Sequence, residues 1–144
     1  MPYAPQLYTT LDRMKARVPA VEQVFLSGAV IDTTAVAEVI LDASSRAVAL
    51  LLGGFTIEQI NALSSDPLFV GAVTDIAIGF SYERKPEWRD ERTGKFPYCE
   101  RIARGEETLK TIGRSYLRLG GEMDVGENLA RAIPAVSSDP PRGW

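Results

Sequence analysis

Two segments of the chain carry apolar residues at spacings of three and four, the repeat of a helix with one buried face. Residues 34–52 place Val36, Ile40, Ala43, Ala47 and Leu50 on one face, and residues 67–84 do so with Phe69, Val73, Ile76 and Phe80. Capping side chains precede both segments, and a glycine pair or a proline follows each of them. We therefore predict an all-α fold, a small bundle of about four to five helices, for this chain of 144 residues.

Shorter helices are predicted before the first long one. Thr9 is a candidate N-cap with an acidic residue three positions later, and Pro19 limits the helix that it opens. Residues 21–26 are expected to form one or two helical turns that break at Gly28. Asp32 precedes the long helix as a capping side chain.

The remaining helices are marked by caps and breakers. Residues 56–59 form a capping-box pattern for a short helix that runs to about Leu63. Asp66 followed by Pro67 predicts the start of the next helix. A last helix is expected from Pro97 to about residue 113, with four residues on its buried side, Ile102, Leu109, Ile112 and Tyr116.

Two pairs of glycines lead to further predictions. Gly53 and Gly54 are predicted to end the long helix in a left-handed conformation. Gly71 and Gly79 lie inside the second apolar segment, where each costs about 1 kcal/mol relative to alanine in an exposed helix. Close packing of a neighbouring helix is the expected compensation.

Composition excludes several classes of function. The 16 Lys and Arg residues against 19 Asp and Glu give a net charge of −3, which creates no overall attraction for nucleic acid or acidic membranes. The chain has no histidine, so it lacks Ser–His and Cys–His catalysis and histidine metal ligands. Cys99 is the single cysteine, and the acidic residues match no metal-loop spacing. We expect no enzyme activity, cofactor or metal, and a soluble protein made in the cytoplasm without a targeting segment.

A densely charged stretch follows the second long helix. Residues 83–95 hold five basic and four acidic side chains, which predicts a nearly neutral, solvated loop anchored by one aromatic residue, Trp88. The four acids nearly cancel any attraction for phosphate. Sequence-specific binding of nucleic acid is therefore not expected from this loop.

The C-terminal part of the chain differs in character. Residues 1–116 are expected to form the helical core, and residues 117–144, with three prolines and a glycine pair, an extended arm. One interpretation is that this arm is a disordered terminus. The other is a segment that orders on a partner surface, because apolar residues are scattered through it. The candidate partner-binding residues are Leu117, Leu119, Val125, Leu129, Ile133, Val136, Arg142 and Trp144.

Three stretches resemble one known family. They are Asp42-Ala43-Ser44-Ser45 leading into residues 50–55, residues 73–77 with 82–86, and residues 109–113 with 117–121. Together they are similar to the helices and turns of Mu-like tailed-phage head–tail connector proteins, also called adaptor or neck proteins, over about residues 9–121. Family members usually place an arginine and a short proline-bearing loop after the long helix, whereas residues 55–65 predict an additional capped helix here.

The resemblance implies a structural virion protein of the phage neck. It implies a ring, commonly of twelve copies, that joins the portal protein to a tail, terminator or stopper protein and surrounds DNA without sequence-specific binding. In such a ring the candidate inter-subunit or channel residues are Arg84, Lys85, Trp88, Arg89 and Arg92. Two alternatives remain: another neck or tail-completion protein, and a small cytoplasmic helical regulator that binds DNA or a protein as a dimer.

Overall fold

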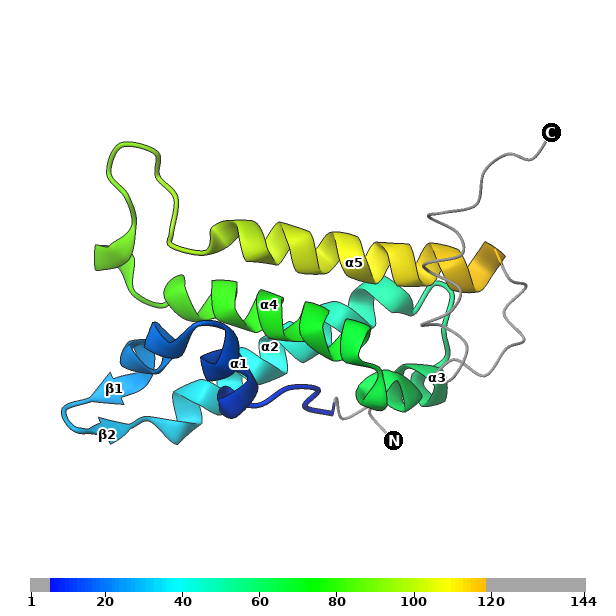
Figure 1. Cartoon of the computed structure of the whole chain (residues 1–144), viewed down its shortest axis with the longest axis horizontal. Helices are drawn as coiled ribbons and strands as arrows, with labels where there is room; N and C mark the ends of the chain where they lie inside the picture. The colour runs from blue at the N-terminus through cyan, green and yellow to red at the C-terminus, as the bar shows by residue number, and fades with distance from the viewer. Residues whose placement is uncertain (1–5, 119–144) are drawn as a thin grey trace.

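In the computed structural model, which describes residues 6–118, helices dominate the chain, and this confirms the predicted all-α bundle. Figure 1 shows the arrangement, with α marking α-helices and η marking 3-10 helices. The elements in chain order are α1 (Leu11–Arg17), η1 (Pro19–Phe25), β1 (Leu26–Ser27), β2 (Val30–Ile31), α2 (Thr33–Leu51), α3 (Ile57–Ala62), η2 (Leu63–Ser65), α4 (Pro67–Tyr82), η3 (Pro86–Trp88) and α5 (Cys99–Arg118).

Helix α4 forms the centre of the core. It packs lengthwise against α5 and also contacts α2, α1 and η1 (Figure 1). Every residue from 69 to 79 is buried, so α4 is enclosed on all sides rather than on the single face that the sequence spacing predicted. An enclosed helix needs no polar face, which explains why apolar residues continue between the periodic positions.

Glycines allow α4 and α5 to approach closely, as expected for Gly79. A Cβ atom at Gly79 would overlap the side chain of Ile102 on α5. Gly105 on α5 makes the reciprocal contact, since a Cβ there would lie 2.6 Å from the carbonyl oxygen of Ala72 on α4. Gly71 faces only the guanidinium group of Arg17, so its neighbour is a flexible side chain rather than a helix.

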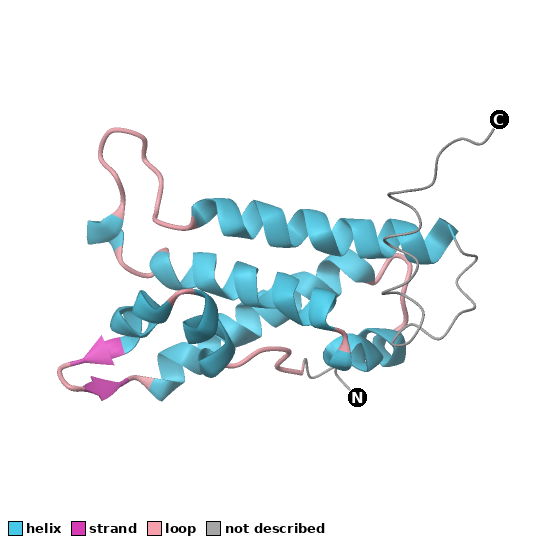
Figure 2. Cartoon of the chain, in the orientation of Figure 1, coloured by secondary structure: helices cyan, strands magenta, loops and turns pink. Residues whose placement is uncertain are grey.

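The N-terminal part contains a small sheet that the sequence did not predict. Residues 21–26 lie mostly in the 3-10 helix η1, and β1 and β2 then pair in an antiparallel hairpin, with Leu26 opposite Ile31 (Figure 2). Gly28 has a φ of +69°, which suits the tight turn between the two strands. The predicted break at this glycine is therefore a hairpin turn.

The caps account for most helix starts. Asp32 accepts a hydrogen bond from the Ala35 N–H, and Thr56 and Gln59 form both bonds of the predicted capping box. Asp66 caps α4 as predicted. At α1 the prediction was wrong by one residue: Thr10 is the N-cap, whereas the buried Thr9 hydroxyl hydrogen-bonds that of Thr74 at 2.7 Å.

Two helix ends differ from the predictions. The C-cap of α2, Leu52, is right-handed, and Gly28 and Gly94 are the positive-φ glycines of the described residues, so Gly53 and Gly54 do not form the expected left-handed cap. Helix α5 begins after Tyr98, whose φ of 61° is incompatible with a helix, rather than at Pro97.

Helix α5 also ends later than predicted. It continues through Gly113 to Arg118, so Leu117, which was assigned to the extended arm, lies in the helix. Seven candidate arm residues lie outside the described residues, namely Leu119, Val125, Leu129, Ile133, Val136, Arg142 and Trp144. Of the expected buried side of α5, Leu109 and Ile112 are fully buried and Ile102 packs against Gly79, whereas the side chain of Tyr116 lies outside the part that the structure describes.

Candidate interaction surfaces

An aromatic cluster fixes both ends of the charged loop at residues 83–95. Trp88 packs against Tyr82 at the end of α4, with ring centroids 5.3 Å apart, and Tyr98 packs against Tyr82 at 4.9 Å. The guanidinium carbon of Arg101 lies 5.8 Å from the centroid of the Tyr98 ring. Trp88 therefore anchors the loop to the bundle, as the sequence predicted.

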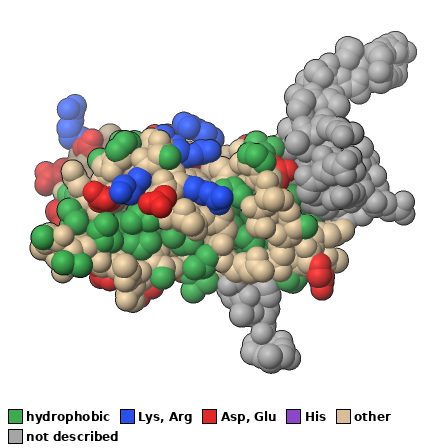
Figure 3. All heavy atoms as spheres, turned by 60° about the horizontal axis from the view of Figure 1, so that its bottom comes forward, with side chains coloured by type: hydrophobic (Ala, Val, Ile, Leu, Met, Phe, Trp, Pro, Cys, Tyr) green, Lys and Arg blue, Asp and Glu red, His purple; other side chains and the backbone are tan. Residues whose placement is uncertain are grey.

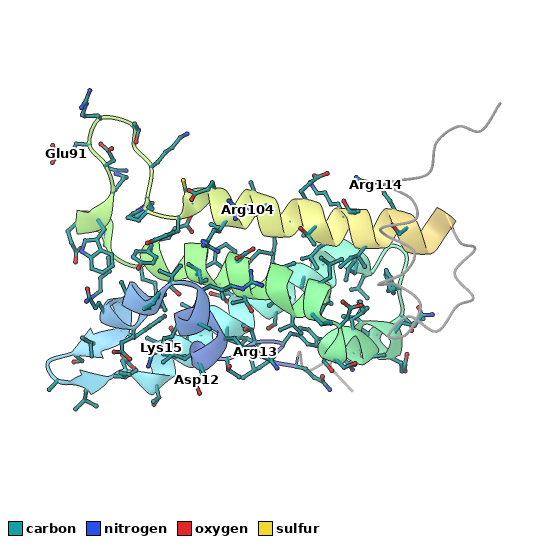
Figure 4. All side chains as sticks on the ribbon, in the orientation of Figure 1. Asp12, Arg13, Lys15, Glu91, Arg104 and Arg114 are labelled. Atoms are coloured by element: carbon teal, nitrogen blue, oxygen red, sulfur yellow. The ribbon has the colours of Figure 1, made fainter. Side chains whose placement is uncertain are left out.

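The tip of this loop is closed by its own hydrogen bonds. The Asp90 N–H donates to the carbonyl oxygen of Lys95 at 2.8 Å, and the Gly94 N–H donates to that of Asp90 at 2.7 Å. The Asp90 carboxylate also accepts from the Arg92 N–H at 2.8 Å. At the hairpin end of the bundle the tip projects to the side, above the level of α5 in Figure 4, where Glu91 is labelled. It is thus an ordered protrusion.

The five candidate loop residues do not share one surface. Arg84 pairs with Glu38 on α2 at 3.4 Å, and half-buried Lys85 lines a cavity of about 240 Å³ next to the hairpin. Trp88 points into the aromatic cluster, whereas Arg89 and Arg92 are exposed on the protruding part. On the face shown in Figure 3, basic and acidic side chains are intermixed rather than gathered into patches of one sign.

The hairpin exposes apolar side chains at the same end of the molecule. Val30 is 70% exposed and Leu26 is 39% exposed, and both lie on the two short strands. Such exposed side chains are suited to contact with another protein, although single exposed apolar residues are common on protein surfaces. The hairpin is therefore a secondary candidate beside the charged loop.

A groove lies between α2 and the C-terminal end of α4. It has a volume of about 570 Å³ and is lined by Val39, Asp42, Ser45, Arg46, Ala49, Phe80, Glu83 and Arg84. Burial raises the pKa of the Glu83 carboxyl above its ordinary value of 4.5. Sequence reasoning missed this groove because its walls come from segments more than 30 residues apart along the chain.

Glu83 gives a pH-dependent prediction. The pKa of the Glu83 carboxyl is higher in the folded protein than its ordinary value of 4.5 in the unfolded chain. The stability that protonation of this carboxyl contributes is therefore fully present below pH 4.5 and is lost as pH rises through the folded pKa. Glu83→Gln, made in a chain that lacks residues 126–144, should therefore stabilise the protein at pH 7, by no more than about 0.5 kcal/mol after solvent screening. The gain should vanish below pH 4.5, where both side chains are neutral. Urea unfolding at pH 7 and at low pH tests this, and a variant that is less stable at pH 7 contradicts it.

A second charged cluster was also missed, although its signal is in the sequence. Asp75 interrupts the apolar run of α4, is 6% exposed, and accepts hydrogen bonds from Arg17 on α1 at 3.0 Å and from Arg101 on α5 at 2.8 Å. One carboxylate thus links three helices. Because both guanidinium groups are directed to this carboxylate, the cluster is a structural crosslink rather than an open site.

Metal clusters and long apolar helices are two further features that could indicate a function. Within residues 6–118 there is no group of three or more His, Cys, Asp or Glu side chains placed to hold a metal ion. No single helix in that range is long and apolar enough to cross a membrane; only α3–η2 taken with α4 reaches that length and composition, across a bend of 94°.

No protein-family model, curated protein or solved structure matches the chain. The resemblance to head–tail connectors consequently rests on the sequence stretches given above. What the structure adds is the arrangement of its surfaces, with the charged loop and hairpin at one end and the end of α5 at the other (Figure 1).

Proposed function

We propose that the protein is a structural subunit of the neck of a tailed phage, a head–tail connector assembled as a ring between portal and tail around the DNA channel. One observation carries this proposal beyond the sequence resemblance. The elongated bundle presents unlike groups at its two ends, the charged loop at residues 83–95 and the C-terminal end of α5 (Figure 1). A connector must bind different neighbours on its two sides.

The charged loop is suited to a contact between subunits. A cyclic ring joins two different faces of each copy, and a contact with both charge signs fixes the register of such an interface. Arg89 and Arg92 flank the acidic pair Asp90 and Glu91 in the loop. Because the tip is already closed by hydrogen bonds, little conformational entropy is lost when it docks.

The charge balance is compatible with DNA that passes through a channel without being held. Affinity for DNA comes mainly from basic residues that neutralise phosphates. Here the net charge is −3, and the acidic residues of the loop lie next to its basic ones. DNA in the channel would therefore meet no surface of strong positive potential on the loop.

The C-terminal segment supplies the test of this proposal. A chain that lacks residues 126–144 retains every described element, so we expect it to fold with unchanged helical circular dichroism. The same chain should be missing from assembled particles, because the segment that contacts the portal, or an adjacent copy, has been removed. Replacing residues 126–144 with a Gly/Ser segment of equal length is the matched control, and should fail in the same way. Normal incorporation of either variant contradicts the proposed role of the segment.

A further inference from the structure

The groove between α2 and α4 combines apolar and acidic linings. Val39 and Ala49 on α2 and Phe80 on α4 contribute the apolar part. The two cations of the lining are already paired, Arg46 with Glu106 on α5 and Arg84 with Glu38. The groove is therefore apolar in part, and its basic side chains are compensated.

The two acidic residues of the lining have no such compensation. Asp42 and Glu83 form no ion pair with any residue between 6 and 118. Both side chains are exposed at the groove, although partial desolvation raises the pKa of the Glu83 carboxyl. A ligand that fits this groove would bring apolar side chains and one positive charge, because a guanidinium group beside the carboxylates would stabilise their charged forms.

The chain itself contains a segment of that composition. Of residues 119–144, the stretch 128–138 has a single charged residue, Arg131, with Leu129, Ile133 and Val136 around it. Twelve residues of α5 separate Glu106, which contacts α2, from the helix end at Arg118, a distance of about 18 Å at 1.5 Å per residue. The thirteen residues from 118 to 131 span up to about 43 Å when extended, so the stretch can reach the groove.

We propose that residues 129–136 of the same chain dock in the α2–α4 groove, with Arg131 beside Asp42 and Glu83 and with Ile133 and Val136 on the apolar lining. Its own chain is the favoured source, because covalent linkage to the same chain gives a segment an effective concentration of about a millimolar. The proposal concerns the isolated subunit, and it does not depend on the connector function. If the protein is a connector, docking in the groove would bury residues 129–136 in the isolated subunit until the segment binds a partner.

The experiment uses the full-length chain with one nitroxide spin label. Cys99→Ser removes the native thiol, and Ser138→Cys places the label two residues beyond Val136. In a ¹⁵N spectrum we expect several-fold loss of amide signal for residues 39–49 and 80–84, with little loss in α3 at the opposite end of the bundle. Arg131→Gln and the double variant Asp42→Asn with Glu83→Gln should each restore most of this signal, whereas the matched variant Arg142→Gln should not.

Other outcomes overturn the proposal. Signal loss spread evenly over the surface would mean that the segment has no defined position. Loss that appears only when a spin-labelled chain is mixed with a separate ¹⁵N chain would assign the groove to a second copy. If Cys99→Ser does not fold, hydrogen exchange on the unlabelled protein replaces the spectrum. Amides of residues 129–136 should then exchange several-fold faster in Arg131→Gln, and equal rates contradict the proposal.

Discussion

Replacing Gly105 with alanine is expected to destabilise the bundle by about 2 kcal/mol or more. The new Cβ would lie 2.6 Å from the carbonyl oxygen of Ala72 and 2.7 Å from Cγ1 of Ile76, both on α4. Since the backbone of α4 cannot rotate away as a side chain can, α4 and α5 would have to separate. The intrinsic helix preference of alanine, about 1 kcal/mol over glycine, offsets only part of this cost.

Gly113, on the same helix, supplies the matched control. A Cβ there would lie 3.6 Å from Cδ2 of Leu51, an ordinary van der Waals contact. Gly113→Ala should therefore leave stability unchanged or raise it by up to about 1 kcal/mol. The urea midpoints of both variants at unchanged m-value measure the difference. Equal effects of the two alanines would contradict the close approach of α4 and α5 at Gly105.

Asp75→Asn is expected to destabilise the protein by about 2–4 kcal/mol. The asparagine keeps the size of the side chain but removes the charge that Arg17 and Arg101 share at one carboxylate oxygen. Loss of one partner from a fully buried ion pair costs about 3–5 kcal/mol, and the estimate is reduced because the Arg17 side chain is 42% exposed. Thermal or urea unfolding of the full-length variant measures the change.

An exposed ion pair provides the comparison for Asp75. Glu107 pairs with Arg114 at 3.1 Å on the surface of α5, with both side chains more than 60% exposed. Glu107→Gln should change the free energy of unfolding by no more than about 0.5 kcal/mol. If Asp75→Asn is as mild as Glu107→Gln, then the three-helix crosslink does not stabilise the fold.

Local side-chain chemistry predicted most of the helices. The capping box at Thr56 and Gln59 and the cap at Asp66 are interactions within one turn, so neighbouring residues are sufficient to predict them. The hairpin was not predicted, because each strand has only two residues, too few to show an alternating pattern of apolar and polar residues. The start of α5 was also predicted wrongly. Tyr98 packs on Tyr82 and has a positive φ, a backbone conformation that its own residue type disfavours.

The candidate surfaces were predictable to a smaller extent. Trp88 could be recognised as an anchor because it is the single aromatic residue among the charged residues 83–95. The groove could not be recognised, since Asp42 and Glu83 lie on different helices and only the fold brings them together. Asp75 carried a signal that could have been used: an acidic residue inside an otherwise apolar helix needs a partner.

Light scattering of the purified full-length protein, alone and mixed with a phage portal protein, is the most direct test of the proposed connector function. We predict either a large ring or a monomer that migrates with the portal, because connector subunits can assemble on their partner. If the protein does not bind the portal here but is incorporated into particles in the truncation experiment above, a different neck or tail-completion protein is favoured. A persistent small dimer that ignores the portal, and that binds duplex DNA in a salt-sensitive manner, would contradict the connector function and indicate a regulator.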